Sequence, residues 1–167
     1  PDDLPAFTFV QLFSEMKSAI QNRNYRFLLL GLFALSMTIG THETLGLYMA
    51  TFYWEFTDAQ IGWLILNNII GYIIGFATAA RLHSAMEKRW TIVISAATLS
   101  IFWSAAVTLR LFDLAPANSS WELVAFIIFF GAFASASGSI LNISVMSALA
   151  DIADEHELNT GRRQEGI

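Results

Sequence analysis

Cysteine is absent from the 167 residues, and charged residues are scarce. Without cysteine the chain has no disulfide, no thiolate metal site and no cysteine nucleophile. Asp, Glu, Lys and Arg make up 14% of the residues, against about 25% in soluble domains, whereas 55% are hydrophobic. This composition predicts a membrane protein. Because the net charge is -5 and no basic stripe with interleaved aromatic residues occurs, nucleic acid is excluded as a partner.

Four apolar stretches are long enough to cross a bilayer, which takes about 20 helical residues. Their predicted ranges are Phe27 to Ala50, Ile61 to Ala80, Thr91 to Leu111 and Leu123 to Ala148. Aromatic residues flank them, as is typical of helix ends anchored at the lipid interface. We therefore expect an all-α membrane protein with four transmembrane helices and membrane lipids as neighbours.

Basic residues gather on one side of the predicted spans. Every Lys and Arg except Arg110 lies before the first span, between the second and third, or after the fourth. Because loops rich in Lys and Arg stay in the cytoplasm, we expect both ends of the chain there, with the protein in a cell (inner) membrane. The loops at residues 51–60 and 112–120 contain neither residue type and should face outward.

The segment before the first span has its own periodicity. Between Phe9 and Arg23, apolar residues recur at intervals of three and four, which predicts an amphipathic helix. Such a helix either lies along the inner membrane surface or packs on the protein as an ordinary loop helix. Since Pro1 is not an initiator methionine, we expect the chain to be part of a longer protein.

Small and amide residues recur within the second and fourth spans. The second carries a row of small residues that is preceded by two amides, and the fourth has a similar row. The members are Asn67, Asn68, Gly71, Gly75 and Ala79, and then Gly131, Ser135, Gly138 and Asn142. Such rows predict close helix packing. The three asparagines are candidates for lining a transport pathway, although a buried amide also commonly forms an interhelical hydrogen bond.

The first span contains the ionisable pair His42 and Glu43. An ionisable residue within a spanning helix costs roughly 2.5 kcal/mol or more, which makes Glu43 a candidate pathway residue. The carboxylate either pairs with His42 or a donor on another helix, binds a proton or cation, or reaches outer water. A zinc-protease motif would need a second histidine that does not follow. Since no phosphate loop, dinucleotide fingerprint or nucleophile elbow occurs either, an enzyme is not expected.

Acidic residues crowd the end of the fourth span. Asp151, Asp154 and Glu157 recur every three residues, so a continuing helix would place them on roughly one face. They would lie at a helix C-terminus, where the helix dipole disfavours negative charge. This end is either a solvated acidic helix end or an ion-pair latch that closes the cytoplasmic side. The residues predicted for the latch are Asp151, Asp154, Glu157, Arg163 and Glu165 with Arg81, Lys88 and Arg89 from the other cytoplasmic loop.

The last residues carry a specific resemblance. The run M-S-A-L-A-D-I-A-D-E-H-E-L-N-T-G-R-R-Q-E-G-I, from Met146 to Ile167, resembles the loop between the tenth and eleventh helices of the glycoside-pentoside-hexuronide:cation symporters. These are relatives of melibiose permease within the major facilitator superfamily. Their pattern A-D-x-x-D-x-x-x-x-x-T-G-x-R-x-E-G is matched by Asp151, Asp154, Thr160, Gly161, Arg163, Glu165 and Gly166. Residues 48–54 and 81–89 resemble the outer end of the seventh helix and the loop between the eighth and ninth.

The resemblance implies helices seven to ten of a twelve-helix transporter, in its C-terminal half. Residues 1–25 would be the central cytoplasmic loop, 26–150 the four spans and 151–167 a charged cytoplasmic loop. The implied function is symport of sugars or glycosides by alternating access. The coupling cation, sodium or a proton, would bind in the first six helices, which with the last two would be partners of this chain. Alternatives are a transporter of another solute such as a lipid, or a scaffold or sensor with the same fold.

The chain also departs from the family pattern. Glu155 and His156 add charge beyond it, and Met86 and Glu87 occupy positions where a glycine-bearing turn is usual. The partners of the charged residues at the cytoplasmic ends are therefore expected to differ in detail from those of the family.

Overall fold

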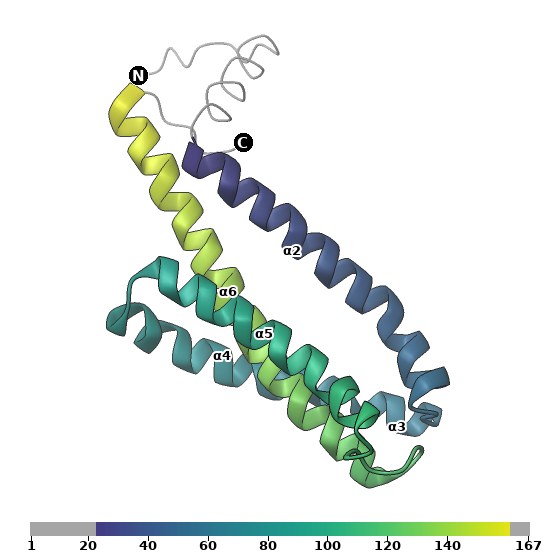
Figure 1. Cartoon of the computed structure of the whole chain (residues 1–167). Helices are drawn as coiled ribbons and strands as arrows, with labels where there is room; N and C mark the ends of the chain where they lie inside the picture. The colour runs from purple at the N-terminus through teal and green to yellow at the C-terminus, as the bar shows by residue number, and fades with distance from the viewer. Residues whose placement is uncertain (1–22, 161–167) are drawn as a thin grey trace, which may run out of the picture. The chain divides into compact units, whose positions relative to one another are not determined.

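The structure is a computed structural model that describes residues 23–160, a range with no β-strand (Figure 1). The predicted amphipathic helix at Phe9 to Arg23 lies outside the described residues except for Arg23. The elements are α2 (Arg23–Tyr48), the π-helix η1 (Met49–Tyr53), α3 (Asp58–Trp63), α4 (Ile65–Ala85), α5 (Lys88–Leu111) and α6 (Trp121–Thr160).

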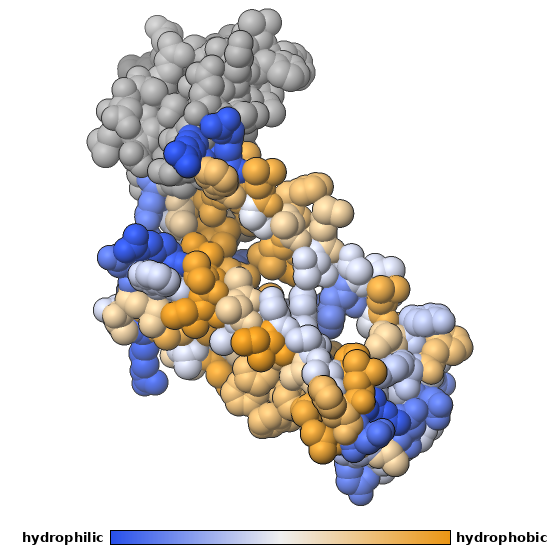
Figure 2. Space-filling model, viewed as in Figure 1, coloured by the Kyte–Doolittle hydropathy of each residue, from blue (hydrophilic) through white to orange (hydrophobic). Residues whose placement is uncertain are grey.

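Four helical segments are long and apolar enough to cross a membrane, which confirms the predicted all-α fold with four spans. They cover Tyr25–Tyr53, Asp58–Ala85, Lys88–Leu111 and Trp121–Asp151. On the face seen in Figure 2, apolar side chains cover much of the helices, and hydrophilic ones gather near helix ends. Two bounds differ from expectation: the second span begins earlier and is interrupted at Leu64, and α6 continues as far as Thr160.

The early start of the second span has a local cause. Thr57 is an N-cap whose hydroxyl accepts from the Gln60 backbone N–H, while the Gln60 side chain accepts from the Thr57 N–H. This capping box satisfies donors that the first turn of a helix leaves open. Polar residues that a hydropathy pattern assigns to a loop therefore begin α3.

The chain divides into two compact units by its contacts. One consists of residues 39–148, and the other of 1–38 with 149–167. Within residues 39–148, α4, α5 and the adjoining part of α6 lie side by side (Figure 1). The described parts of the other unit are both helical, namely the beginning of α2 and the end of α6.

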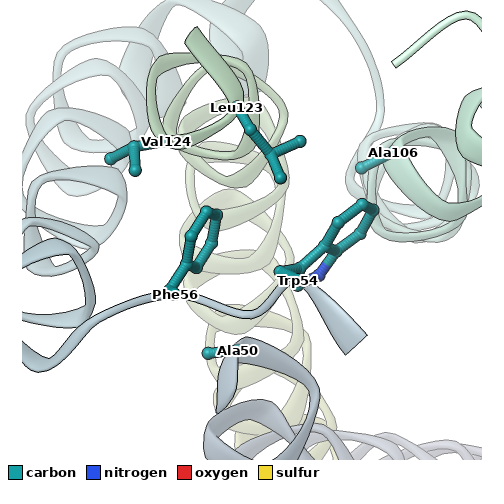
Figure 3. Packing of buried hydrophobic residues seen from close by; sticks show 6 residues of the cluster. All are labelled: Ala50, Trp54, Phe56, Ala106, Leu123 and Val124. Carbon is teal, nitrogen blue, oxygen red and sulfur yellow. The ribbon is translucent and has the colours of Figure 1, made fainter. Parts of the chain in front are cut away.

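An apolar cluster closes one end of the 39–148 unit. Trp54 and Phe56, from the connection after η1, pack with Leu123 and Val124 of α6, and the Trp54 ring points toward Ala106 of α5 (Figure 3). Leu123 and Val124 have 0% and 2% of their surface exposed. The connection between α2 and α3 is therefore attached to both later helices.

Hydrogen bonds join the two predicted outer loops beside this cluster. Arg110 donates to the Pro116 carbonyl at 2.8 Å and to Asn118 Oδ1 at 2.6 Å. Asn118 Nδ2 in turn donates to the Tyr53 carbonyl at 3.2 Å, and Gln60 Nε2 donates to the Ser119 carbonyl at 2.8 Å. The only basic residue on its side of the predicted topology thus orders the loop between α5 and α6. This role requires a guanidinium fork, since two separate acceptors are bound.

Close packing of α4 on α6 positions the polar residues of the site. A methyl group added at Gly71 would lie 2.5 Å from Ser135 Cβ and 2.6 Å from the Ala132 carbonyl oxygen. Gly75 similarly faces the Ala136 carbonyl oxygen, 2.9 Å from where its Cβ would be. The row of small residues on α4 therefore allows backbone to approach backbone, as the sequence predicts.

Candidate functional site

A polar pair lies where α4 crosses α6. Ser135 Oγ donates a hydrogen bond to Asn68 Oδ1 at 2.7 Å. Ser135 is one residue from the midpoint of the span Trp121–Asp151, and Asn68 is three to four residues from that of Asp58–Ala85. At about 1.5 Å per residue, both lie within roughly 5 Å of mid-span. The structure therefore places one predicted pathway residue, Asn68, at the depth where transporters bind their solutes.

Asn67 occupies a different environment from its neighbour. Its side chain packs on Gly131, where an added Cβ would lie 2.9 Å from Asn67 Cβ. The Oδ1 atom is buried and has no hydrogen-bond partner among the described residues. A buried amide oxygen normally has a partner, so this acceptor requires a donor from a water or from a group outside residues 23–160.

Asn142 is not brought to this pair. It lies seven residues after Ser135 on α6, roughly 10 Å along the axis. Its side chain is exposed and makes no hydrogen bond within the described part of the chain. It remains a candidate by its position in the span alone.

The ionisable pair of the first span is arranged through an aromatic contact. The His42 ring stacks on Trp103 of α5, with centroids 4.2 Å apart and planes 8° from parallel. Glu43 is exposed and makes no hydrogen bond or ion pair with the described residues. The stack occupies the His42 ring face, and the predicted His42–Glu43 hydrogen-bonded pair is not formed.

The residues of the predicted latch are described unequally. Asp151 is exposed, and Asp154 and Glu157 follow it on the continuous helix α6, so the expected helical spacing of the three positions is present. Arg163 and Glu165 lie outside the described residues. Arg81 and Arg89 are exposed and Lys88 is half-buried. Arg89 already pairs with Glu87 at 2.7 Å. Whether the acidic and basic groups meet stays a prediction.

Sequence reasoning missed a second contact between α4 and α6. His83 Nε2 lies 2.7 Å from the hydroxyl of Ser144, a residue with 0% of its surface exposed. Because Ser144 Oγ donates to the Ile140 carbonyl at 2.7 Å, the His83 ring N–H is the donor in the contact with Ser144. Ser135 was recognised as a packing residue, but its hydrogen bond was not predicted. The available signal was a serine on the small-residue face of one helix and an asparagine on that of another.

Comparison with known proteins connects these features to a family. The whole chain, residues 1–167, matches the family model described as MFS/sugar transport protein. No match was found among curated proteins or among solved structures. The family match agrees with four membrane-crossing helices and with polar side chains paired at mid-span. The chain belongs to the MFS/sugar transport protein family.

Proposed function

We propose that the chain forms part of a secondary transporter that couples movement of a sugar or glycoside to that of a cation by alternating access. The observation that carries this proposal is the family match over the whole chain. The Asn68–Ser135 pair supports it, because a fixed amide in mid-span is expensive in lipid and suits a polar solute. The coupling cation, sodium or a proton, binds in the helices that precede this chain.

The chain supplies helices seven to ten, with both ends in the cytoplasm of a cell membrane. In this placement the midplane pair contributes to the solute pathway, while Glu43 and Asn142 line it nearer its two ends. What supports the orientation is the distribution of Lys and Arg, because Arg110 is engaged in ordering the loop between α5 and α6.

The acidic end of α6 forms a cytoplasmic gate with basic residues. Asp151, Asp154, Glu157 and Glu165 contribute negative charge, and Arg81, Lys88, Arg89 and Arg163 contribute positive charge. The continuous helix through Asp151 supports this, since unpaired acids at a helix C-terminus are unfavourable. Arg89 already has an acidic partner in Glu87, so its share in the gate is the smallest.

Uptake into proteoliposomes tests the proposed function. The purified full-length protein is reconstituted, and uptake of labelled monosaccharides, disaccharides and methyl glycosides is measured with an imposed sodium or proton gradient. Uptake that follows one of the gradients supports a cation-coupled sugar transporter. Gradient-driven uptake of a labelled lysolipid alone would identify a lipid transporter. No uptake of any solute by well-folded protein would favour the scaffold or sensor with the same fold.

A further inference from the structure

We propose that Asn68 donates a hydrogen bond from its side-chain amide to a hydroxyl group of the transported glycoside, and that Ser135 positions that amide. This inference rests on the proposed transport function and names a solute contact within it. It is carried by three features of the pair: an unusual use of the Ser135 hydroxyl, an amide N–H with no partner, and the depth of both residues.

The hydroxyl of Ser135 is used differently from the other hydroxyls of the described spans. The Ser and Thr side chains that donate hydrogen bonds there generally donate to a carbonyl of their own helix, three or four residues earlier. Examples are Thr78, Thr98, Ser100, Ser104, Ser137 and Ser144. Ser135 instead donates to a side chain of another helix, Asn68 on α4. Its hydroxyl therefore holds the amide of Asn68 in one orientation.

That orientation leaves a donor free. An amide has one oxygen and one NH2 group, and the oxygen of Asn68 is the atom that Ser135 occupies. The NH2 group has no hydrogen-bond partner among residues 23–160, and the Asn68 side chain is exposed. In a hydrocarbon environment two unpaired N–H groups would cost several kcal/mol. An acceptor must therefore be supplied from beyond the described chain.

The depth of the pair determines the kind of acceptor. Water and lipid headgroups are absent from the centre of the hydrocarbon, so an exposed amide near mid-span faces either a polar group of another helix or a solute pathway. A neutral amide donor beside a neutral hydroxyl suits the oxygen of a sugar hydroxyl and provides no charge for an anion. Close contact of Gly71 with α6 keeps both helices in register beneath the pair. The site is therefore rigid enough to select one hydroxyl position.

The experiment combines side-chain deletion with hydroxyl deletion. Full-length wild type, Asn68→Ala, Ser135→Ala and the double variant are reconstituted, and uptake is measured for the best-transported methyl glycoside and each of its monodeoxy analogues. Removing one neutral hydrogen bond should raise KM about fivefold in Asn68→Ala, with the maximal rate kept within about twofold. For the analogue that lacks the contacted hydroxyl, Asn68→Ala and wild type should have the same KM.

Ser135 acts through Asn68, so its deletion has a distinct signature. Ser135→Ala should raise KM for the same glycoside by about twofold, and adding it to Asn68→Ala should cause no further change. Thr78→Ala on α4 and Ser100→Ala on α5 remove hydroxyls that donate to their own helices, and both should retain wild-type KM. Thermal unfolding of each purified variant shows whether it is folded.

The outcomes separate this inference from the proposed function. Equal KM increases for the parent glycoside and every analogue, or a lower melting temperature with unchanged KM, would show that Asn68 contacts another helix and would overturn the inference alone. A wild-type protein that transports no glycoside would overturn the proposed substrate class and the inference together. A loss of discrimination confined to one hydroxyl position would establish the contact.

Discussion

Replacing Gly71 by alanine tests the packing of α4 on α6. The new methyl would lie 2.5 Å from Ser135 Cβ, 2.6 Å from the Ala132 carbonyl oxygen and 2.9 Å from the Ala136 nitrogen. Two of these atoms belong to the α6 backbone, so the clash is relieved only if the helices separate. Overpacking of this kind costs about 1–3 kcal/mol, and the higher helix propensity of alanine returns up to about 1 kcal/mol. We therefore expect a net loss of about 1–2 kcal/mol in the free energy of unfolding.

The matched control is Gly138→Ala on α6. There the added methyl would meet only Leu99 Cδ1, at an ordinary contact distance of 3.7 Å. We expect this variant to match or exceed the wild type in stability because only the helix-propensity gain applies. The assay is thermal unfolding of purified full-length protein in detergent, followed by tryptophan fluorescence. A melting temperature of Gly71→Ala equal to that of Gly138→Ala would refute the close approach of α4 and α6.

Three further changes test other parts of the chain. Asp154→Asn should lower solute uptake about two- to fivefold, the range for one solvated ion pair, without reducing the amount of protein in the membrane; reversing the charge of its arginine partner together with Asp154→Arg should restore part of the uptake, and a single variant with normal uptake would count against the gate. Arg110→Ala removes charged hydrogen bonds to Pro116 and Asn118, so limited proteolysis should cut the loop between α5 and α6 faster than in wild type, and an unchanged cleavage rate would contradict its ordering role. Ser144→Ala leaves the His83 ring N–H without its acceptor and should destabilise the protein by about 1 kcal/mol in thermal unfolding, whereas Ser100→Ala should be neutral.

Part of the candidate site could be predicted from local sequence. Asn67, Asn68 and the glycines after them stand out because lipid-facing helices have no use for amides or for rows of small residues. The contact of Ser135 with Asn68 could not be predicted, since the two residues are 67 positions apart and their meeting depends on how far each helix is rotated and shifted. The stack of His42 on Trp103 was missed for the same reason.

Arg110 illustrates a different kind of difficulty. The distribution of charge identified it as the one basic residue on its side of the membrane, and topology alone gives it no function there. Its side chain donates to two acceptors in the following loop, one of which also holds the Tyr53 carbonyl. Irregular loops pair their polar groups case by case, so no periodic pattern announces these bonds.

The sequence by itself determined that this protein is helical, that it has four spans and roughly where each begins, because the cost of placing a segment in lipid is summed along a single helix. The tertiary structure alone decided which polar groups meet. Asn68 receives the Ser135 hydroxyl, Asn67 packs on Gly131 with its oxygen unpaired, and Asn142 stays apart. The physical reason is that hydrogen bonds act over about 3 Å, so the register between α4 and α6, and not the residue types alone, selects the partners.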